Sequence, residues 1–144
     1  LGIQPKAELR TRTLSLMTGA TFTQYRGERW GWEVVTQVSY TWKKTTLNGF
    51  FKYQGQTPIF LGDEEGNVQW RWIGGFPWLD LSISRPFWRG HFHVVLGLRN
   101  ALNITNVQAN LAGGVHSGGG FNSPVGMGRY PFIRIEYLLQ KGQL

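Results

Sequence analysis

The chain contains no cysteine and no long apolar run, and only 16% of its 144 residues are charged. Without cysteine it lacks the disulfide framework that stabilises many small secreted domains. No apolar run approaches the ~20 residues of a membrane-spanning helix. The low charge excludes a disordered chain, which combines high charge with low hydrophobicity. A mean hydropathy of −0.25 does not exclude membrane strands, because alternating side chains keep their average low.

Glycine and aromatic residues are abundant instead: the chain has 20 glycines, and aromatic residues make up 15% of it. With threonine and valine they favour strands and turns over a helical bundle. The net charge of +7 is compatible with nucleic-acid binding, but the fifteen lysines and arginines are scattered. Anionic lipid headgroups or charged walls inside a barrel explain the charge at least as well, so we expect no nucleic-acid partner.

The most informative segment is Trp30–Trp42, which reads WGWEVVTQVSYTW. Every second residue, starting at Trp30, forms a series that is apolar in the middle and aromatic at both ends. The alternate positions are mostly small or polar, so the two series are the two sides of a strand. Aromatic residues at both ends of an apolar face are typical of strands that cross an outer membrane. At ~3.3 Å per residue and a tilt of ~40°, the run rises roughly 30 Å.

Alternation along the chain predicts about six strands. They span residues 8–23, 30–42, 46–54, 68–84, 91–99 and 129–139, with a bulge or bend at 74–77. The connections at 43–46 and 85–90 are short, and those at 24–29, 54–67 and 100–128 are longer. Outer-membrane barrels have short periplasmic turns and longer extracellular loops. On that assignment, six antiparallel strands place both termini in the periplasm.

Six strands are too few to close a membrane barrel, for which about eight is the minimum. An open edge in lipid would leave backbone groups unpaired at several kcal/mol each. The first residues also lack the basic segment and apolar core of a signal peptide, so we expect a mature chain or a piece of a longer one. Either two strands are still hidden, or this chain is part of a larger barrel.

The order of the motifs favours the larger barrel. Residues 93–107, HVVLGLRNALNITNV, resemble the penultimate strand of TonB-dependent outer-membrane receptors. In that family the strand ends in glycine, an apolar residue, a basic or polar residue and Asn-Leu-Phe followed by Asn or Asp, and Val-Thr-Asn comes next. Here Ala101 precedes Leu102. A long loop and a closing strand follow in the family, and residues 128–137, GRYPFIRIEY, are similar to that strand. Residues 47–58 and 79–85 resemble the neighbouring hairpins of Bacteroidetes members, although this chain continues past Tyr137, where the family usually ends.

The resemblance implies an all-β fold, the last strands of a 22-stranded antiparallel transmembrane β-barrel, with residues 1–144 as its C-terminal segment and no plug domain in this chain. It implies TonB-dependent import of a scarce nutrient, such as an iron chelate, haem, cobalamin or a glycan, at the cell outer membrane. The implied partners are the remaining barrel and plug (a separate chain or the rest of the same polypeptide), outer-membrane lipid, TonB acting through the plug, and a small-molecule or glycan ligand.

Two sets of residues are candidates for these roles. Aromatic residues near strand ends are expected to form a membrane girdle: Trp30, Trp32, Tyr40, Trp42, Tyr53 and Tyr137. Since a transporter of this kind captures its ligand at the outer loops, polar residues of the connection 100–128 are the expected ligand contacts: Asn106, Gln108, Asn110, His116 and Asn122. Trp70 and Trp72 either belong to the girdle or stack on a sugar.

No catalytic constellation is assembled in the sequence, and we expect neither an enzyme nor a cofactor. His91 and His93 share a strand face, but a third metal ligand is missing, so polar lumen residues explain them better than a metal site. Residues 63–65, DEE, are better explained as a solvated loop tip than as a calcium or catalytic cluster. The serines lie in no G-x-S-x-G elbow, and the glycines at 118–120 precede no lysine. The alternative function is a soluble β-sandwich that binds carbohydrate or another ligand.

Overall fold

The computed structural model describes residues 1–24, 30–62, 68–110 and 121–138, and these form antiparallel strands joined by turns. The strands are β1 (Gly2–Ile3), β2 (Lys6–Arg10), β3 (Leu14–Gln24), β4 (Trp30–Trp42), β5 (Thr45–Gln54), β6 (Thr57–Gly62), β7 (Val68–Ile73), β8 (Phe76–Phe87), β9 (Phe92–Arg99), β10 (Asn106–Asn110), β11 (Phe121–Pro124) and β12 (Tyr130–Tyr137). A single 3₁₀ turn, η1 (Trp88–Gly90), is the one helical element in these ranges. The expected all-β, antiparallel fold is confirmed.

The described residues contain no helix with the length and apolar character needed to cross a membrane.

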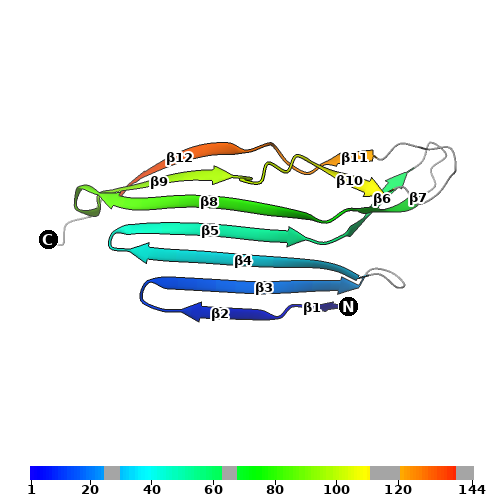
Figure 1. Ribbon diagram of the computed structural model, residues 1–144, viewed down its shortest axis with the longest axis horizontal. Coiled ribbons are helices and arrows are strands. Elements are labelled where there is room, and N and C mark those ends of the chain that lie inside the picture. The colour runs from blue at the N-terminus through cyan, green and yellow to red at the C-terminus, as the bar shows by residue number, and fades with distance from the viewer. Residues whose placement is uncertain (25–29, 63–67, 111–120, 139–144) are drawn as a thin grey trace.

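Eight strands form a large sheet in the order β1-β3-β4-β5-β8-β9-β12, with β2 also paired to β3. Since β1 and β2 share one edge of β3, seven strands stand side by side (Figure 1). Predicted strand 30–42 is confirmed as β4, and β5, β9 and β12 lie within two residues of their predictions. The predicted strand 68–84 is broken into β7 and β8 at Gly74–Gly75, where a bend was expected.

The predicted strand 8–23 is wrong, because its first part folds back as a hairpin. β2 and β3 pair antiparallel, with Leu9 opposite Leu16. The reversal lies at residues 11–13, where the Thr11 hydroxyl oxygen accepts a hydrogen bond from the Leu14 amide at 3.0 Å. The positions of the leucines account for the turn. Leu9 is at an odd position, whereas Leu14 and Leu16 are at even ones, so one continuous strand would place them on opposite faces. The hairpin instead brings them to the same face.

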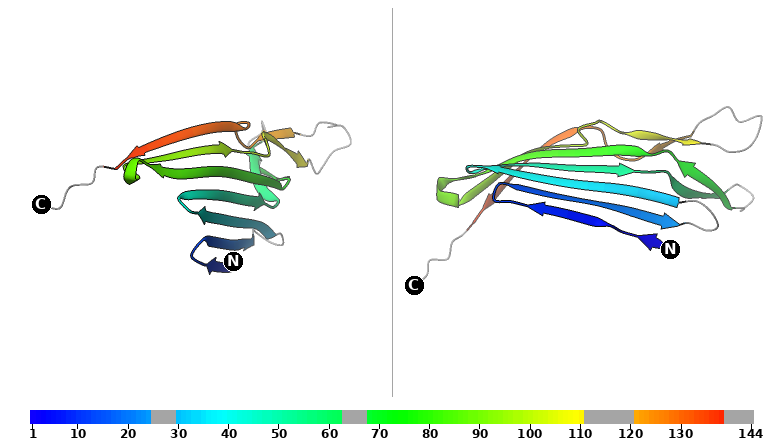
Figure 2. Two further views of the ribbon diagram at one scale, coloured as in Figure 1. Left: turned by 60° about the vertical axis from the view of Figure 1, so that its left-hand side comes forward. Right: turned by 60° about the horizontal axis from the view of Figure 1, so that its bottom comes forward.

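A second, four-stranded sheet has the order β11-β10-β7-β6. It lies beyond the end of the large sheet rather than over its face (Figures 1 and 2). Its strands extend the hairpins of the large sheet, because β6 and β7 follow β5 and precede β8, and β10 and β11 lie between β9 and β12. Residues 54–67 and 100–128, predicted as loops, therefore contain strands. Their short segments lack the sustained alternation that revealed the longer strands.

The two ends of the large sheet differ. At one end, here called the short-turn end, the chain reverses at residues 11–13, 43–44 and 88–91. The small sheet lies at the opposite, loop end (Figure 1). Since seven strands rather than six stand side by side, β1 begins at the loop end and β12 finishes at the short-turn end. The six-strand count, from which both termini were expected on the same side, is therefore wrong for the described strands.

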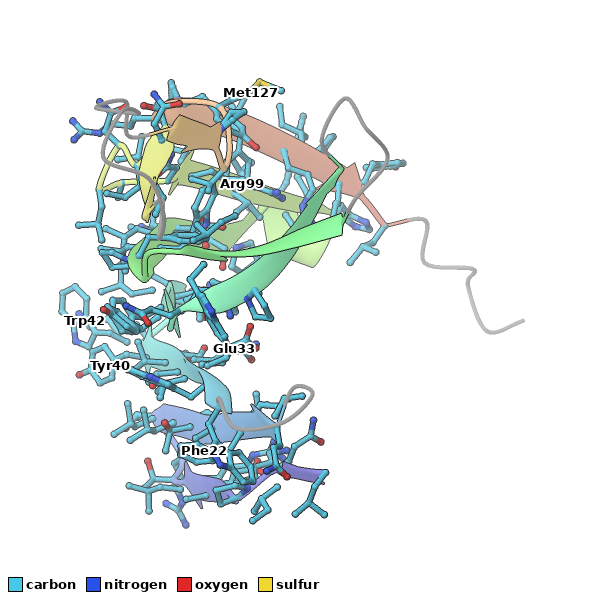
Figure 3. All side chains as sticks on the ribbon, turned by 90° about the vertical axis from the view of Figure 1, so that its right-hand side faces the viewer. Phe22, Glu33, Tyr40, Trp42, Arg99 and Met127 are labelled. Atoms are coloured by element: carbon cyan, nitrogen blue, oxygen red, sulfur yellow. The ribbon has the colours of Figure 1, made fainter. Side chains whose placement is uncertain are left out.

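The large sheet is curved and remains open (Figure 2). Seen nearly along the strands, Tyr40 and Trp42 project from its convex side, and Glu33 and Arg99 project from the other (Figure 3). The described residues contain only two buried hydrophobic side chains of the core, Val95 and Val107. The sheet therefore has no core of the kind that forms between two packed layers.

Candidate functional site

One face of the large sheet is apolar along its whole width. Register alignment places Leu16 of β3 in one row across the strands with Val38, Gly49, Leu81, Leu98 and Pro131. The next row towards the short-turn end contains Leu14, Tyr40, Leu47, Ile83, Leu96 and Ile133. Because side chains alternate along each strand, all of these residues share one side of the sheet, here called the apolar face.

The apolar face is exposed instead of packed. Exposed large side chains on it come from every strand of the sheet: Ile3, Leu9, Phe22, Trp30, Trp32, Val38, Tyr40, Trp42, Leu47, Leu81, Ile83, Phe87, Leu96, Ile133, Ile135 and Tyr137. Trp42 is 63% exposed and Ile133 is 64% exposed. The largest apolar patch on a soluble monomer is typically about 300–600 Å². At roughly 150–250 Å² per aromatic side chain, the half-exposed aromatic residues alone present about 500–900 Å².

Aromatic side chains lie at both ends of the apolar face. At the loop end, the rings of Trp32 and Tyr53 stack with centroids 5.1 Å apart, and Trp30 and Phe22 lie beside them in the register. At the short-turn end, Phe92 packs against Tyr137 at 4.9 Å. The structure thus divides the six predicted girdle residues into two bands, with Trp30, Trp32 and Tyr53 in one and Tyr40, Trp42 and Tyr137 in the other.

The aromatic band at the short-turn end does not stay in one row of the register. Tyr40 and Trp42 mark it in β4, whereas in β8, β9 and β12 it lies one row further on, at Phe87, Phe92 and Tyr137. A band that follows a plane across tilted strands must shift in this way, because neighbouring residues in the register lie perpendicular to the strands.

The opposite, polar face carries paired charges. The Lys52 ammonium lies 2.6 Å from the Glu33 carboxylate across β4 and β5. Glu136 contacts the Arg134 guanidinium at 3.1 Å and His93 at 3.4 Å. These side chains are partly exposed, so each pair contributes only about 0–1 kcal/mol. The ion pairs therefore belong to a hydrated surface and not to a buried ionic core.

A hollow of about 390 Å³ lies on the polar face. It is lined by residues from several strands, including Arg10, Met17, Phe50, Asp80, Arg99 and Phe132. Met17, Phe50 and Phe132 give this hollow an apolar part among its polar side chains. The Arg99 guanidinium lies 5.5 Å from the centre of the Phe132 ring, within range of a cation–π contact.

A buried polar junction joins the loop-end segments to the large sheet. Asn100 is completely buried, and its side-chain amide donates to the carbonyl oxygens of Ile104 and Met127, both at 2.8 Å. Its side-chain oxygen accepts from the Ile104 amide at 2.9 Å. The Asp80 carboxylate accepts from the Asn100 amide and from the Trp78 indole, both at 2.8 Å. These bonds fix where the chain leaves β9 and where it returns towards β12.

The predicted ligand residues fall mostly on the small sheet. In its register, position 108 lies opposite position 122, position 106 opposite 124 and position 110 opposite 72. These pairings bring positions 106, 108, 110 and 122 onto neighbouring strands of this sheet. Asn106 is exposed and contacts the Thr105 hydroxyl at 3.3 Å. His116 lies outside the described residues.

The other candidates gain no further ligands in the structure. His93 pairs with Glu136, and His91 lies beside the Tyr137 ring at 6.4 Å. Within the described ranges, no group of three or more His, Asp or Glu side chains is placed to hold a metal ion. Residues 63–65 and the glycines at 118–120 lie outside those ranges.

Sequence reasoning missed the junction at Asn100 and Asp80, and it missed Arg85. Asn100 was part of a recognised motif, but its role depends on Met127, which is 27 residues away. Arg85 had a visible signal, because it continues the alternation of Leu81, Ile83 and Phe87 and is therefore a cation on the apolar face.

Comparison of the chain with protein-family models, with curated proteins and with solved structures gives no match.

Proposed function

We propose that the chain forms the closing strands and extracellular loops of an outer-membrane, TonB-dependent transporter that imports a scarce nutrient. The observation that carries the membrane placement is the exposed apolar face between two aromatic bands. Lipid tails would cover the aliphatic rows, and the amphipathic rings would lie at the two lipid–water interfaces.

The distribution of charge supports the same placement. Apart from Arg85 at its margin, the charged strand residues of the large sheet lie on the polar, concave face. A barrel wall needs this asymmetry, because a charge that faces the centre of the bilayer costs about 2–4 kcal/mol whereas a lumen-facing charge remains hydrated. The long connections at the loop end and the short turns at the other end match the extracellular and periplasmic sides of such barrels.

The alternative, a soluble β-sandwich, requires a second sheet packed over the apolar face. In the described part of the chain, the small sheet instead extends the large one beyond its loop end (Figure 2). The transport role rests on the resemblance of residues 93–107 and 128–137 to TonB-dependent receptors. In this role, the plug and the remaining strands come from a separate chain or from the rest of the polypeptide.

The membrane placement is tested by a matched pair of substitutions. Val38 lies on the apolar face between the bands, and its neighbour Ser39 lies on the polar face. Val38→Arg is expected to destabilise membrane insertion by about 2–4 kcal/mol, because its charge faces the bilayer centre. Ser39→Arg, with the same added charge, should remain in the membrane fraction. The readout is the amount of protein that resists carbonate extraction and reacts with a lipid-phase photoprobe.

Equal effects of the two substitutions, or a wild-type chain that is monomeric in water without detergent, would contradict the membrane placement. The transport role is tested separately by disrupting the gene and measuring uptake of labelled iron chelate, haem, cobalamin and glycan. Loss of uptake of one of them is expected. Unchanged uptake of all four would remove the transport role and leave the membrane placement intact.

A further inference from the structure

Arg85 is the one charged residue on the apolar face among the described strand residues of the large sheet. It lies in β8 one step beyond the Thr46–Ser84 pair, level with Trp42 of β4 and one row inside Phe87, which marks the aromatic band in β8. A charge at the bilayer centre would be costly, but near the interface the cost falls to about 0–1 kcal/mol. Arg85 is thus one row from the interface, where its long side chain can reach the lipid headgroups.

Two further cations, Lys43 and Lys44, lie near Arg85. A hollow of about 420 Å³ is lined by Trp42, Lys43, Lys44, Thr45 and Arg85, here called the headgroup site. The Lys43 ammonium lies 5.0 Å from the Trp42 ring, and the Arg85 guanidinium lies 5.7 Å from the Phe87 ring. Across the part of the chain that the structure describes, none of the three cations forms a salt bridge. The site therefore concentrates positive charge without a carboxylate to neutralise it.

An apolar groove adjoins the headgroup site. It has a volume of about 540 Å³ and is lined mainly by Leu47, Leu81, Ile83, Leu96 and Leu98, here called the acyl groove. Leu47 follows Thr45 by two residues on the same face of β5, and Ile83 precedes Arg85 by two residues in β8. Two residues of a strand span about 7 Å. The groove therefore begins close enough to the cations for one lipid to contact both.

We propose that the headgroup site and the acyl groove together bind one anionic phospholipid of the inner, periplasm-facing leaflet. The phosphate and any further anionic group would lie among Lys43, Lys44 and Arg85, where Arg85 can donate two parallel hydrogen bonds. An acyl chain would follow the groove towards the centre of the apolar face. This inference rests on the membrane placement proposed above and adds a lipid class and a binding site to it.

The test measures lipid preference of the detergent-purified protein, exchanged into nanodiscs of phosphatidylcholine with a small fraction of phosphatidylglycerol. Native mass spectrometry after controlled release counts the lipids that stay bound. The wild type is expected to retain phosphatidylglycerol over phosphatidylcholine. Arg85→Gln should lower that preference about fivefold to tenfold, because one cation near a membrane surface has an effect of this order.

Arg89→Gln is the matched control. Arg89 lies in η1 at the same end and carries the same charge, but it is outside the headgroup site. Its substitution should leave the lipid preference unchanged. Equal losses of preference in both variants would show that general charge attraction causes the effect and would overturn the proposal. Displacement of the lipid by millimolar inorganic phosphate would also overturn it, since the site would then bind only the ion.

The acyl groove is tested by Leu81→Phe, which fills it without changing charge. The variant is expected to weaken retention of long-chain phosphatidylglycerol and to spare a short-chain analogue. Equal retention of both lipids would contradict the groove. If Val38→Arg and Ser39→Arg behave as expected but Arg85→Gln retains the full lipid preference, only this inference fails and the membrane placement stands.

Discussion

Asn100 shows how one residue can hold several distant segments. It has a left-handed backbone, with φ of 49°, which asparagine tolerates better than most residues. Its side chain bonds Ile104 and Met127, and its backbone amide bonds Asp80. The junction therefore joins β8, the turn after β9 and the segment before β12, and it positions the small sheet that carries the candidate ligand residues.

Substitution Asn100→Gly tests the side-chain bonds alone, because glycine accepts the positive φ without strain. Loss of three buried hydrogen bonds is expected to lower the free energy of unfolding by about 2–4 kcal/mol. Asn106→Ala, which removes an exposed amide, should change it by no more than about 0.5 kcal/mol. Denaturant unfolding in detergent measures both, and similar values for the two variants would contradict the role of the junction.

At the scale of elements, β9 and β12 are held together by an aromatic ring that covers a glycine. Gly97 lies directly opposite Phe132, and a Cβ built at position 97 would clash with the Phe132 ring. The ring therefore occupies the space above Gly97 on the polar face. Such aromatic cover compensates for the missing side chain of a glycine within a strand.

Gly97→Ala is expected to displace the Phe132 ring and to destabilise the β9–β12 pair by about 1–3 kcal/mol, as overpacking does. Gly19→Ala in β3 is the matched control, since a Cβ there meets its nearest atom at 3.4 Å. The double variant Gly97→Ala/Phe132→Leu should recover part of the loss. Urea unfolding of the detergent-solubilised protein gives the comparison, and a harmless Gly97→Ala would disprove the clash.

At the scale of the whole molecule, the odd number of side-by-side strands restricts what can close the sheet. β2 and β12 both run towards the short-turn end, and within the described residues each pairs on one side only. An antiparallel closing segment must therefore start and finish with strands that run the opposite way, so it has an odd number of strands. Two copies of this chain, both inserted the same way up, would instead meet in two parallel seams.

We therefore expect the detergent-solubilised assembly to contain polypeptide other than copies of this 16.4 kDa chain. Native mass spectrometry gives the total mass, and denaturing mass spectrometry identifies the components. Unpaired strand edges in lipid cost several kcal/mol per backbone group, so the chain alone should not persist as an open sheet. A particle composed only of copies of this chain would contradict the strand-parity argument.

Much of the large sheet was predictable, because alternation is a local property of the sequence. The run of β4 fixed both its bounds and its apolar face, and β5, β9 and β12 followed within two residues. The hairpin of β2 and β3 was missed because the alternation of apolar residues shifts by only one position at the turn. Such a shift is easily taken for an irregularity within one long strand. The small sheet was missed because its strands are short, and its pairing of position 108 with 122 depends on segments separated along the chain.

The sequence by itself determined an all-β chain, with two chemically different strand faces and aromatic residues at the ends of the apolar one, since a strand's period of two is encoded residue by residue. Only the tertiary structure decided that seven strands stand side by side, that β1 begins and β12 finishes at opposite ends of the sheet, and that Arg85 joins Lys43 and Lys44. Those facts depend on turns and register, which arise when strands pair across tens of residues.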